Sequence, residues 1–205
     1  MIFTSSWCGR YYPFHMDCPL FLPLAACTHP ALVGGKAVGL ARLLAGGFSV
    51  PPGFCVTTEA YDRALRATGF SPAERWSAAL HSSGTERQKI LSWCRTTIQN
   101  ADIAELTAQI VEQVRLLDPP LQGFWAVRSS ATNEDGVSAS FAGIYLTRLG
   151  IPPEEIGLAM KDLWLSMWDE RVLNYHATSG VSDVPAMAVL LQPMVEAQAA
   201  GVAYS

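Results

Sequence analysis

The sequence predicts an α+β fold, and three observations lead to that class. Residues 58–118 place apolar side chains at the three- and four-residue spacing of amphipathic helices. Residues 123–127 and 185–195 are short apolar runs and residues 144–149 alternate in polarity, as strands do. The two kinds of segment do not alternate regularly, which argues against a parallel βαβ protein. We therefore expect α+β architecture with a helical middle section at about residues 58–118.

The composition is that of a globular protein and excludes several functions. Of the 205 residues, 50% are hydrophobic and only 16% are charged, which suits a buried core rather than a disordered chain. The formal net charge of -4 argues against a general nucleic-acid or membrane-surface binder. No apolar run approaches the ~18 residues that a membrane span requires. An anionic ligand would have to be held by a few placed cations.

The cysteine pattern favours a cytoplasmic protein with reduced thiols. Five cysteines are an odd number, and no two of them form a C-x-x-C pair. Neither a disulfide framework nor a zinc site is therefore predicted. Residues 1–18 show no periodicity and are left unassigned.

A glycine pair near the N-terminus marks the first candidate site. We expect residues 19–27 to form a strand that leads into Gly34-Gly35, followed by a helix from Lys36 to Ala45. Glycines before a helix, with a lysine in its first turn, form a plausible phosphate cradle, because the helix N-terminus and the lysine both attract anions. The spacing is not that of a Walker A loop. A helix start with a solvated lysine is the simpler alternative.

The middle section is predicted to be structural. Residues 48–56 read as two short strands around a Pro-Gly turn. Four helices follow, and their expected ranges are 58–68, 73–81, 85–99 and 103–117. Their charged residues lie opposite apolar stripes, which indicates solvated helix faces without chemistry.

A second candidate site follows the apolar run at residues 123–127. We expect this strand to end at Arg128 and to turn through a small polar loop that begins with Ser129-Ser130. The guanidinium offers a fixed fork of donors, and the loop adds hydroxyl and N–H groups, so the stretch suits an anion. A strand end with an ordinary surface turn is the alternative.

The last third of the chain adds strands and one long helix. A strand is expected at 144–149, a helix from Pro152-Pro153 to about Thr178, and a buried strand at 185–195 that carries Gln192 near its end. A further strand is expected at 200–205. An apolar strand there with nothing to cover it suggests a domain that is incomplete at the C-terminus.

Four motifs occur together in order and resemble a known family. They read Val33-Gly34-Gly35-Lys36-Ala37-Val38-Gly39-Leu40-Ala41, Val50-Pro51-Pro52-Gly53-Phe54, Ala126-Val127-Arg128-Ser129-Ser130-Ala131-Thr132-Asn133-Glu134-Asp135 and Ser140-Phe141-Ala142-Gly143. They are similar to the N-terminal nucleotide-binding domain of phosphoenolpyruvate synthase and pyruvate phosphate dikinase, a domain that rifampin phosphotransferase shares. The resemblance identifies residues 19–205 as part of such an ATP-binding domain.

The resemblance implies an ATP-grasp-like fold that holds ATP between two lobes. Lys36 and Arg128 match the family's two phosphate-binding cations, and Gly143 and Thr147 match its phosphate-covering loop. The resemblance also places Gln192 near the adenine, with Met194 and Val195 lining the hinge. Ile144-Tyr145 stand where most members have Gln-Gln, so the polar lining of that loop is reduced.

The resemblance also implies a reaction and its partners. Members transfer a phosphoryl group from ATP to a histidine on a separate domain, and from there to pyruvate or to rifampin. The Mg²⁺ ligands and the phosphohistidine and acceptor domains are expected outside this chain, in a longer chain or a separate polypeptide. No catalytic residue and no metal ligand is assigned here. The alternatives are a rifampin-phosphotransferase-type antibiotic kinase fragment and a non-catalytic nucleotide-binding or interaction module.

Overall fold

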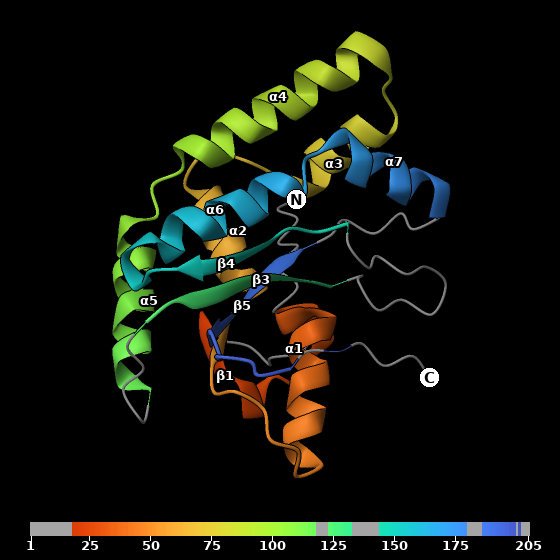
Figure 1. Cartoon of the computed structure of the whole chain (residues 1–205). Coiled ribbons are helices and arrows are strands. Elements are labelled where there is room, and N and C mark those ends of the chain that lie inside the picture. The colour runs from red at the N-terminus through yellow and green to blue at the C-terminus, as the bar shows by residue number, and fades with distance from the viewer. Residues whose placement is uncertain (1–17, 118–122, 133–143, 180–185, 200, 202–205) are drawn as a thin grey trace.

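One antiparallel sheet organises the chain in a computed structural model that describes residues 18–117, 123–132, 144–179, 186–199 and 201. The sheet has five strands in the order β1-β2-β5-β3-β4, and every neighbouring pair is antiparallel (Figure 1). The strand bounds are β1 Phe21–Pro23, β2 Phe54–Val56, β3 Trp125–Ala131, β4 Thr147–Ile151 and β5 Met187–Pro193. The predicted α+β class is confirmed.

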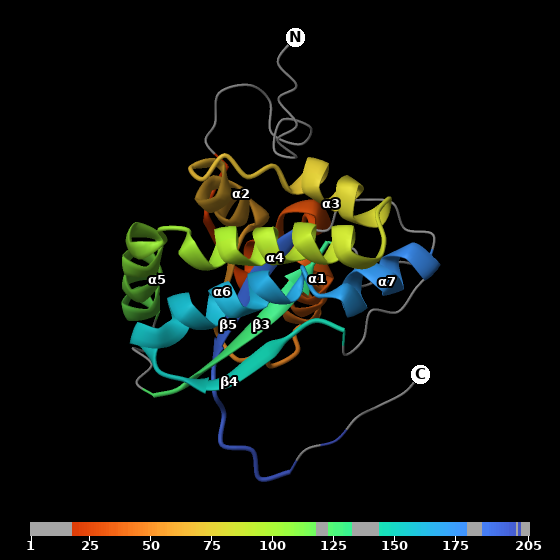
Figure 2. The ribbon, with the colours of Figure 1, turned by 90° about the horizontal axis from the view of Figure 1, so that it is seen from above.

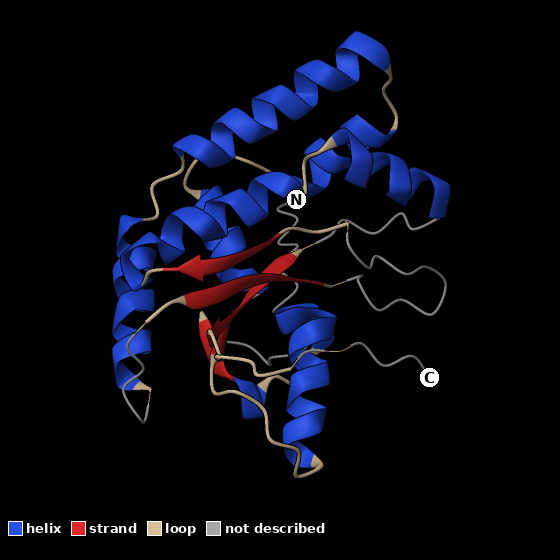
Figure 3. Cartoon of the chain, viewed as in Figure 1, coloured by secondary structure: helices blue, strands red, loops and turns tan. Residues whose placement is uncertain are grey.

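The helices lie on both faces of the sheet, but unequally. Helix α1 covers one face, and α2 to α7 gather on the other (Figures 1 and 2). Figure 3 shows the same arrangement with the strands between the two groups of helices. The helix bounds are α1 Pro30–Ala45, α2 Thr58–Arg66, α3 Pro72–Leu80, α4 Gly84–Asn100, α5 Ala104–Leu116, α6 Ile156–Ser166 and α7 Glu170–Ser179, with short 3₁₀ turns at Leu24–Ala26 and Pro153–Glu155.

The sheet divides the apolar core into a large cluster under α2 to α7 and a small cluster under α1. Alternate residues of the strands point to opposite faces, so one set of strand side chains packs under α2 to α7 and the other set packs under α1. The larger cluster contains Trp125, Val127 and Leu191 together with side chains of the helices. The smaller cluster joins residues of α1 to Cys55 and Ala188. Among the described residues, α1 and a small apolar cluster therefore cover this face of the sheet.

The predicted middle helices are confirmed, with ends that differ by one or two residues. The structure corrects several other predictions. Residues 48–50 are not a strand, and only β2 forms in that region. The helix expected from residue 153 to 178 is divided into α6 and α7. At the break Trp168 enters the core, where its indole N–H donates to the Tyr61 hydroxyl at 3.2 Å and its ring packs edge-on against Trp76.

The third correction concerns the cysteines. Cys27, Cys55 and Cys94 are free, as predicted, and all three are buried. Cys18 is disulfide-bonded, so the expectation of reduced thiols throughout is wrong at that residue. Among the described helices, none combines the length and the apolar character that crossing a membrane demands.

Helix α1 is interrupted at Gly34, which has a φ of 73° and a ψ of 170°. The helix that carries Lys36 therefore starts after the glycine, as the sequence predicted, while residues 30–33 add a turn that the sequence reading placed in a loop. The interruption lies against β3. A Cβ at Gly34 would lie 2.0 Å from the carbonyl oxygen of Ser130, so only glycine fits both the dihedral angles and the space.

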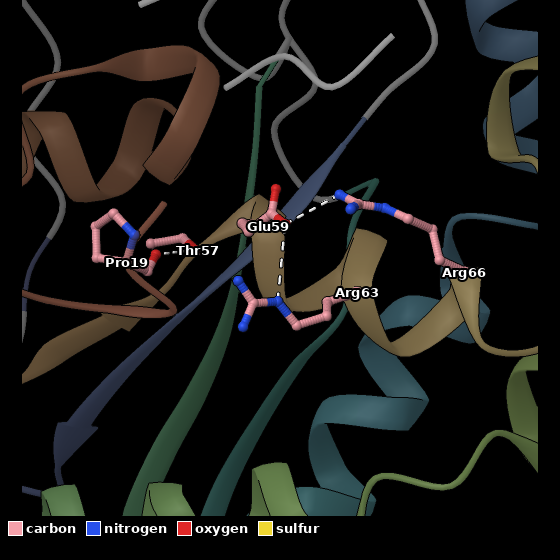
Figure 4. A network of polar contacts seen from close by, with 5 residues as sticks. All are labelled: Pro19, Thr57, Glu59, Arg63 and Arg66. Carbon is pink, nitrogen blue, oxygen red and sulfur yellow. Dashed lines mark hydrogen bonds and ion pairs between the residues drawn. The ribbon is translucent and has the colours of Figure 1, made fainter. Parts of the chain in front are cut away.

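A polar network holds the start of α2. The carboxylate of Glu59 is almost buried and accepts a hydrogen bond from Arg66 at 3.0 Å, with Arg63 at 3.8 Å (Figure 4). The hydroxyl of Thr57 donates to the carbonyl of Pro19 at 2.8 Å. The Thr57 bond joins the segment before β1 to the start of α2, and the Glu59 pairs link successive turns of that helix.

The close contact at Gly34 predicts unequal effects for two glycines of one helix. Gly34→Ala should lower the free energy of unfolding by about 3 kcal/mol or more, since it adds an overlap to a strained backbone. Gly39→Ala is the matched control, because a Cβ there meets nothing within 4 Å, and it should raise stability by about 0.5–1 kcal/mol. Urea denaturation measures both. Equal effects would contradict the close approach of α1 to β3.

The carboxyl of Asp62 predicts a pH-dependent stability. Burial raises the pKa of Asp62 from 3.8 to about 6, against the opposing charge of Arg66 and together with the like charge of Glu59. A raised folded-state pKa favours the folded protein below about pH 4, and that contribution is lost as the pH rises through about 6.

Asp62→Asn should therefore stabilise the protein by about 1–2 kcal/mol at pH 7.5, less than the full shift implies because the side chain keeps some contact with water. At pH 4 the variant and the parent should unfold at similar urea concentrations. A difference of the same size at both pH values would show that ionisation of Asp62 is not the cause.

Candidate functional site

The candidate site is built on β3, which corrects the sequence reading of this stretch. The strand does not stop at Arg128 but runs to Ala131, and it pairs with β5 along its whole length. Ser129 and Ser130 are fully buried instead of forming a surface turn. Arg128 and Ser130 share the α1 face of the sheet, whereas Ser129 points to the face covered by α2 to α7. The arginine therefore projects from the middle of a sheet and not from a loop.

Lys36 reaches the same strand from α1. Its Nζ donates a hydrogen bond to the carbonyl oxygen of Ser129 at 3.0 Å, across 93 residues of sequence. Because Ser129 follows Arg128 directly, the structure brings the two predicted cations together over β3. Both residues are partly buried.

Ser130 connects the main chain of α1 to β3. Its hydroxyl donates to the carbonyl oxygen of Val33 at 2.7 Å and accepts from the amide of Ala37 at 3.2 Å. These two partners stand on opposite sides of the Gly34 break. The sequence reading counted Ser130 only as part of a polar loop, and its role was missed.

Gln192 adds a polar side chain from β5 beside Arg128 of β3. Lys36, Arg128, Thr147 and Gln192 are together called the polar row. It lies opposite Ala126 in the register of the two strands, and only 7% of it is exposed. Its amide oxygen accepts from Nη1 of Arg128 at 3.5 Å, and its amide nitrogen donates to the carbonyl of Pro51 at 3.0 Å. The two partners fix the orientation of the amide, since one requires an acceptor and the other a donor.

The segment before β2 approaches β5 as closely as α1 approaches β3. A Cβ at Gly53 would lie 2.2 Å from the carbonyl oxygen of Leu191. That approach holds Pro51 within reach of Gln192. The Pro-Pro-Gly motif is therefore part of the site, although the sequence reading treated it as a turn between strands.

Thr147 lies on the other side of Arg128. The two residues are direct partners between β4 and β3, so their side chains leave the same face of the sheet. Thr147 is exposed. Tyr145, one of the two residues that depart from the family pattern, is buried, and its hydroxyl lies 3.2 Å from Nε2 of His176. The tyrosine therefore does not line the α1 face.

Met194 and Val195 follow β5 at the end of the sheet where Gln192 lies. Both are exposed, at 44% and 59%. The amide of Met194 donates to the carbonyl of Phe124 at 2.8 Å, and the Phe124 side chain is also exposed. An apolar patch of Phe124, Met194 and Val195 thus adjoins the polar row.

Two further predictions concern the loop and the metal. Gly143 lies outside the described residues. Within the described part of the chain, no group of three or more His, Cys, Asp or Glu side chains is placed to hold a metal ion.

The arrangement is suited to an elongated anion with an apolar end. Two cations and a hydroxyl stand over β3 and β4, and an amide and exposed apolar side chains follow along β5. An arginine fork and a lysine point charge bind phosphate oxygens in complementary ways.

Comparison with known proteins identifies the family. Residues 30–205 match the family model described as the pyruvate phosphate dikinase AMP/ATP-binding domain. The chain is 36% identical to a phosphoenolpyruvate synthase of Aeropyrum pernix, with 85% of this chain and 22% of that protein covered. It is 36% identical to the prodigiosin synthesizing transferase PigC of Serratia marcescens, with 86% and 18% covered. It is 32% identical to a rifampicin phosphotransferase of Streptomyces sviceus, with 85% and 21% covered.

The chain thus spans about a fifth of the length of these relatives. The match runs from the first turn of α1 through every strand of the sheet except β1, and so includes all of the polar row. The chain belongs to the family of pyruvate phosphate dikinase AMP/ATP-binding domains.

Proposed function

We propose that this chain holds ATP on the α1 face of the sheet, with the phosphates between Lys36 and Arg128. One observation carries the proposal: a lysine of α1 binds the carbonyl oxygen of Ser129, the residue that directly follows Arg128 on β3. In a chain with a net charge of -4, this placement concentrates positive charge where a polyphosphate could lie.

The phosphate end of the site comprises Lys36, Arg128, Thr147 and Gly143. Arg128 presents its guanidinium from a rigid strand, and Lys36 contributes a second charge from the helix that crosses it. The Thr147 hydroxyl stands on the same face and can donate to a phosphate oxygen. In this proposal Gly143 supplies a backbone N–H in a loop that covers the phosphates.

The adenine end comprises Gln192, Met194 and Val195. Adenine needs a flat apolar surface and a few placed hydrogen-bonding groups. The exposed side chains that follow β5 supply the surface, and Gln192 marks the boundary with the phosphates. The distance from Arg128 to this end is set by the register of β3 against β5.

The proposed architecture is one ATP-grasp-like domain over residues 19–205. The remaining length of the relatives is where we place the Mg²⁺ ligands, the phosphorylated histidine and the acceptor site. Mg²⁺ neutralises charge on the phosphates during phosphoryl transfer. Since the described residues gather no metal-binding cluster, we assign no metal ligand among them.

The proposed reaction is the nucleotide half of a phosphotransferase resembling phosphoenolpyruvate synthase. It passes a phosphoryl group from ATP to a histidine carrier, and then to pyruvate or a related acceptor. A rifampicin-phosphotransferase-type fragment would use the same ATP site with another acceptor. A nucleotide-binding module without turnover would retain the ATP site but not carry out the reaction.

The proposed site predicts that substitutions on the α1 face of the sheet weaken ATP binding, whereas substitutions on the opposite face do not. Lys36→Ala and Arg128→Ala should each raise the Kd for ATP by about 10- to 100-fold, because each removes a charge-assisted hydrogen bond. Isothermal titration calorimetry measures the Kd.

The chain offers a matched control for each variant. Arg148 lies on β4 but is paired with Asp162 of α6 at 2.8 Å, and Lys161 donates to the carbonyl of Gln99 at 2.9 Å. Both residues lie on the side of the sheet that α2 to α7 cover. Arg148→Ala and Lys161→Ala should leave the Kd for ATP within about twofold. ATP binding that survives Lys36→Ala and Arg128→Ala unchanged would reject the assignment.

A turnover assay distinguishes nucleotide binding from catalysis. With ATP and Mg²⁺, this chain alone should bind nucleotide and release no AMP or ADP above the rate of its Arg128→Ala variant. Product formation that requires Arg128 in the isolated chain would show that the chain is sufficient for the reaction. Thin-layer chromatography of labelled nucleotide measures the products.

A further inference from the structure

We propose that Ser130 is the positioning residue that sets the place of Lys36 relative to Arg128. It does so by inserting its side-chain hydroxyl into the break of α1. The proposal rests on the ATP site described above and adds to it a residue that does not touch the nucleotide.

The hydroxyl replaces one missing hydrogen bond of the helix. In an uninterrupted α-helix the amide of residue i donates to the carbonyl of residue i−4. Ala37 and Val33 would form such a pair, but Gly34 between them has non-helical φ and ψ, which interrupts the geometry that this bond needs. The Ser130 hydroxyl accepts from the Ala37 amide at 3.2 Å and donates to the Val33 carbonyl at 2.7 Å. A hydroxyl suits this place because it donates and accepts at once.

The geometry leaves little freedom for another arrangement. Ser130 is fully buried, and a Cβ at Gly34 would lie 2.5 Å from its Oγ and 2.0 Å from its carbonyl oxygen. Removal of the hydroxyl would take the acceptor from the Ala37 amide and would leave the Val33 carbonyl to the Cys55 thiol, a weak donor at 3.7 Å. An unsatisfied buried polar group is costly, so the start of the second helical segment would shift to find other partners.

Lys36 is the residue that such a shift would move. It immediately precedes Ala37, and its own Nζ binds the carbonyl of Ser129. Three consecutive residues of β3 thus act together: Arg128 supplies a cation, Ser129 holds the lysine head, and Ser130 holds the amide of Ala37, the residue after the lysine. The separation of the two cations is therefore fixed by one strand.

A second hydroxyl provides the structural comparison. Thr58 of α2 donates to the carbonyl of Ala31 at 3.2 Å and is almost fully buried. Ala31 lies before the break, so Thr58 fastens the half of α1 that does not carry Lys36. Loss of this bond should destabilise the fold without moving the lysine.

The test is a double-mutant cycle between Ser130→Ala and Lys36→Ala, with ATP binding measured by calorimetry. Ser130→Ala alone should raise the Kd for ATP by about 10-fold. In the Lys36→Ala background the same change should raise it by less than about twofold, since no lysine remains to be positioned. Thr58→Ala should leave the Kd unchanged in both backgrounds.

Ser130→Cys extends the test to a variant with a side chain of similar shape. A thiol is a weak donor and acceptor, so this variant should fold and give a smaller loss of ATP affinity than Ser130→Ala. It also serves as the first member of the cycle where the alanine variant does not fold.

Each of the following results would overturn the positioning role of Ser130. Equal effects of the Ser130 variants with and without Lys36 would overturn the positioning role and leave the ATP site intact. No effect of Ser130→Ala or Ser130→Cys on ATP binding would overturn it as well. If Lys36→Ala itself leaves ATP binding unchanged, the proposed site fails, and the positioning role fails with it.

Discussion

The contact between α1 and β3 at Gly34 is the constraint on which the rest of the site depends. At this point the main chain of the helix lies against the main chain of the strand, with no room for a Cβ between them. The contact requires a glycine in the helix and a small hydroxyl residue in the strand. Because it interrupts α1, it also creates the unpaired groups that the Ser130 hydroxyl binds. Lys36 owes its position over β3 to this single approach.

The division of the core explains why the site lies on this face. On one side of the sheet, α2 to α7 bury a large apolar cluster that includes the tryptophans Trp76, Trp125, Trp164 and Trp168. On the other side, α1 covers only part of the strands with a small cluster. The strand positions beyond α1 carry Arg128, Thr147 and Gln192 instead of apolar side chains. The large core holds the sheet rigid, and the exposed part of the opposite face is left for polar contacts.

The sequence was sufficient for the helices between residues 58 and 117, and it singled out Lys36 and Arg128 as candidate cations. The helices from residue 58 to 117 follow from their apolar periodicity, which is a local property. Lys36 and Arg128 stood out because each follows or joins residues that suit anions. The extent of β3 could not be predicted, since Ser129-Ser130 before a polar run reads locally as a turn. The buried Ser130 hydroxyl bonds a partner 97 residues away, and no local pattern records that contact.

The same reasoning applies to Gln192 and Pro51, whose hydrogen bond spans 141 residues. The glutamine could be named from the resemblance, but its link to the Pro-Pro-Gly segment required the fold. The division of the last helix at Trp168 is likewise a tertiary effect, because that indole packs between α2 and α3. Local patterns gave the elements, and long-range contacts assembled the site.

The central claim is that nucleotide binds on the α1 face of the sheet. A crystal structure of this chain with a non-hydrolysable ATP analogue tests it most directly. The account predicts phosphate oxygens within hydrogen-bonding distance of Nζ of Lys36 and of the Arg128 guanidinium, with the adenine near Gln192 and Met194. Nucleotide bound among α2 to α7, or phosphates remote from both cations, would contradict it.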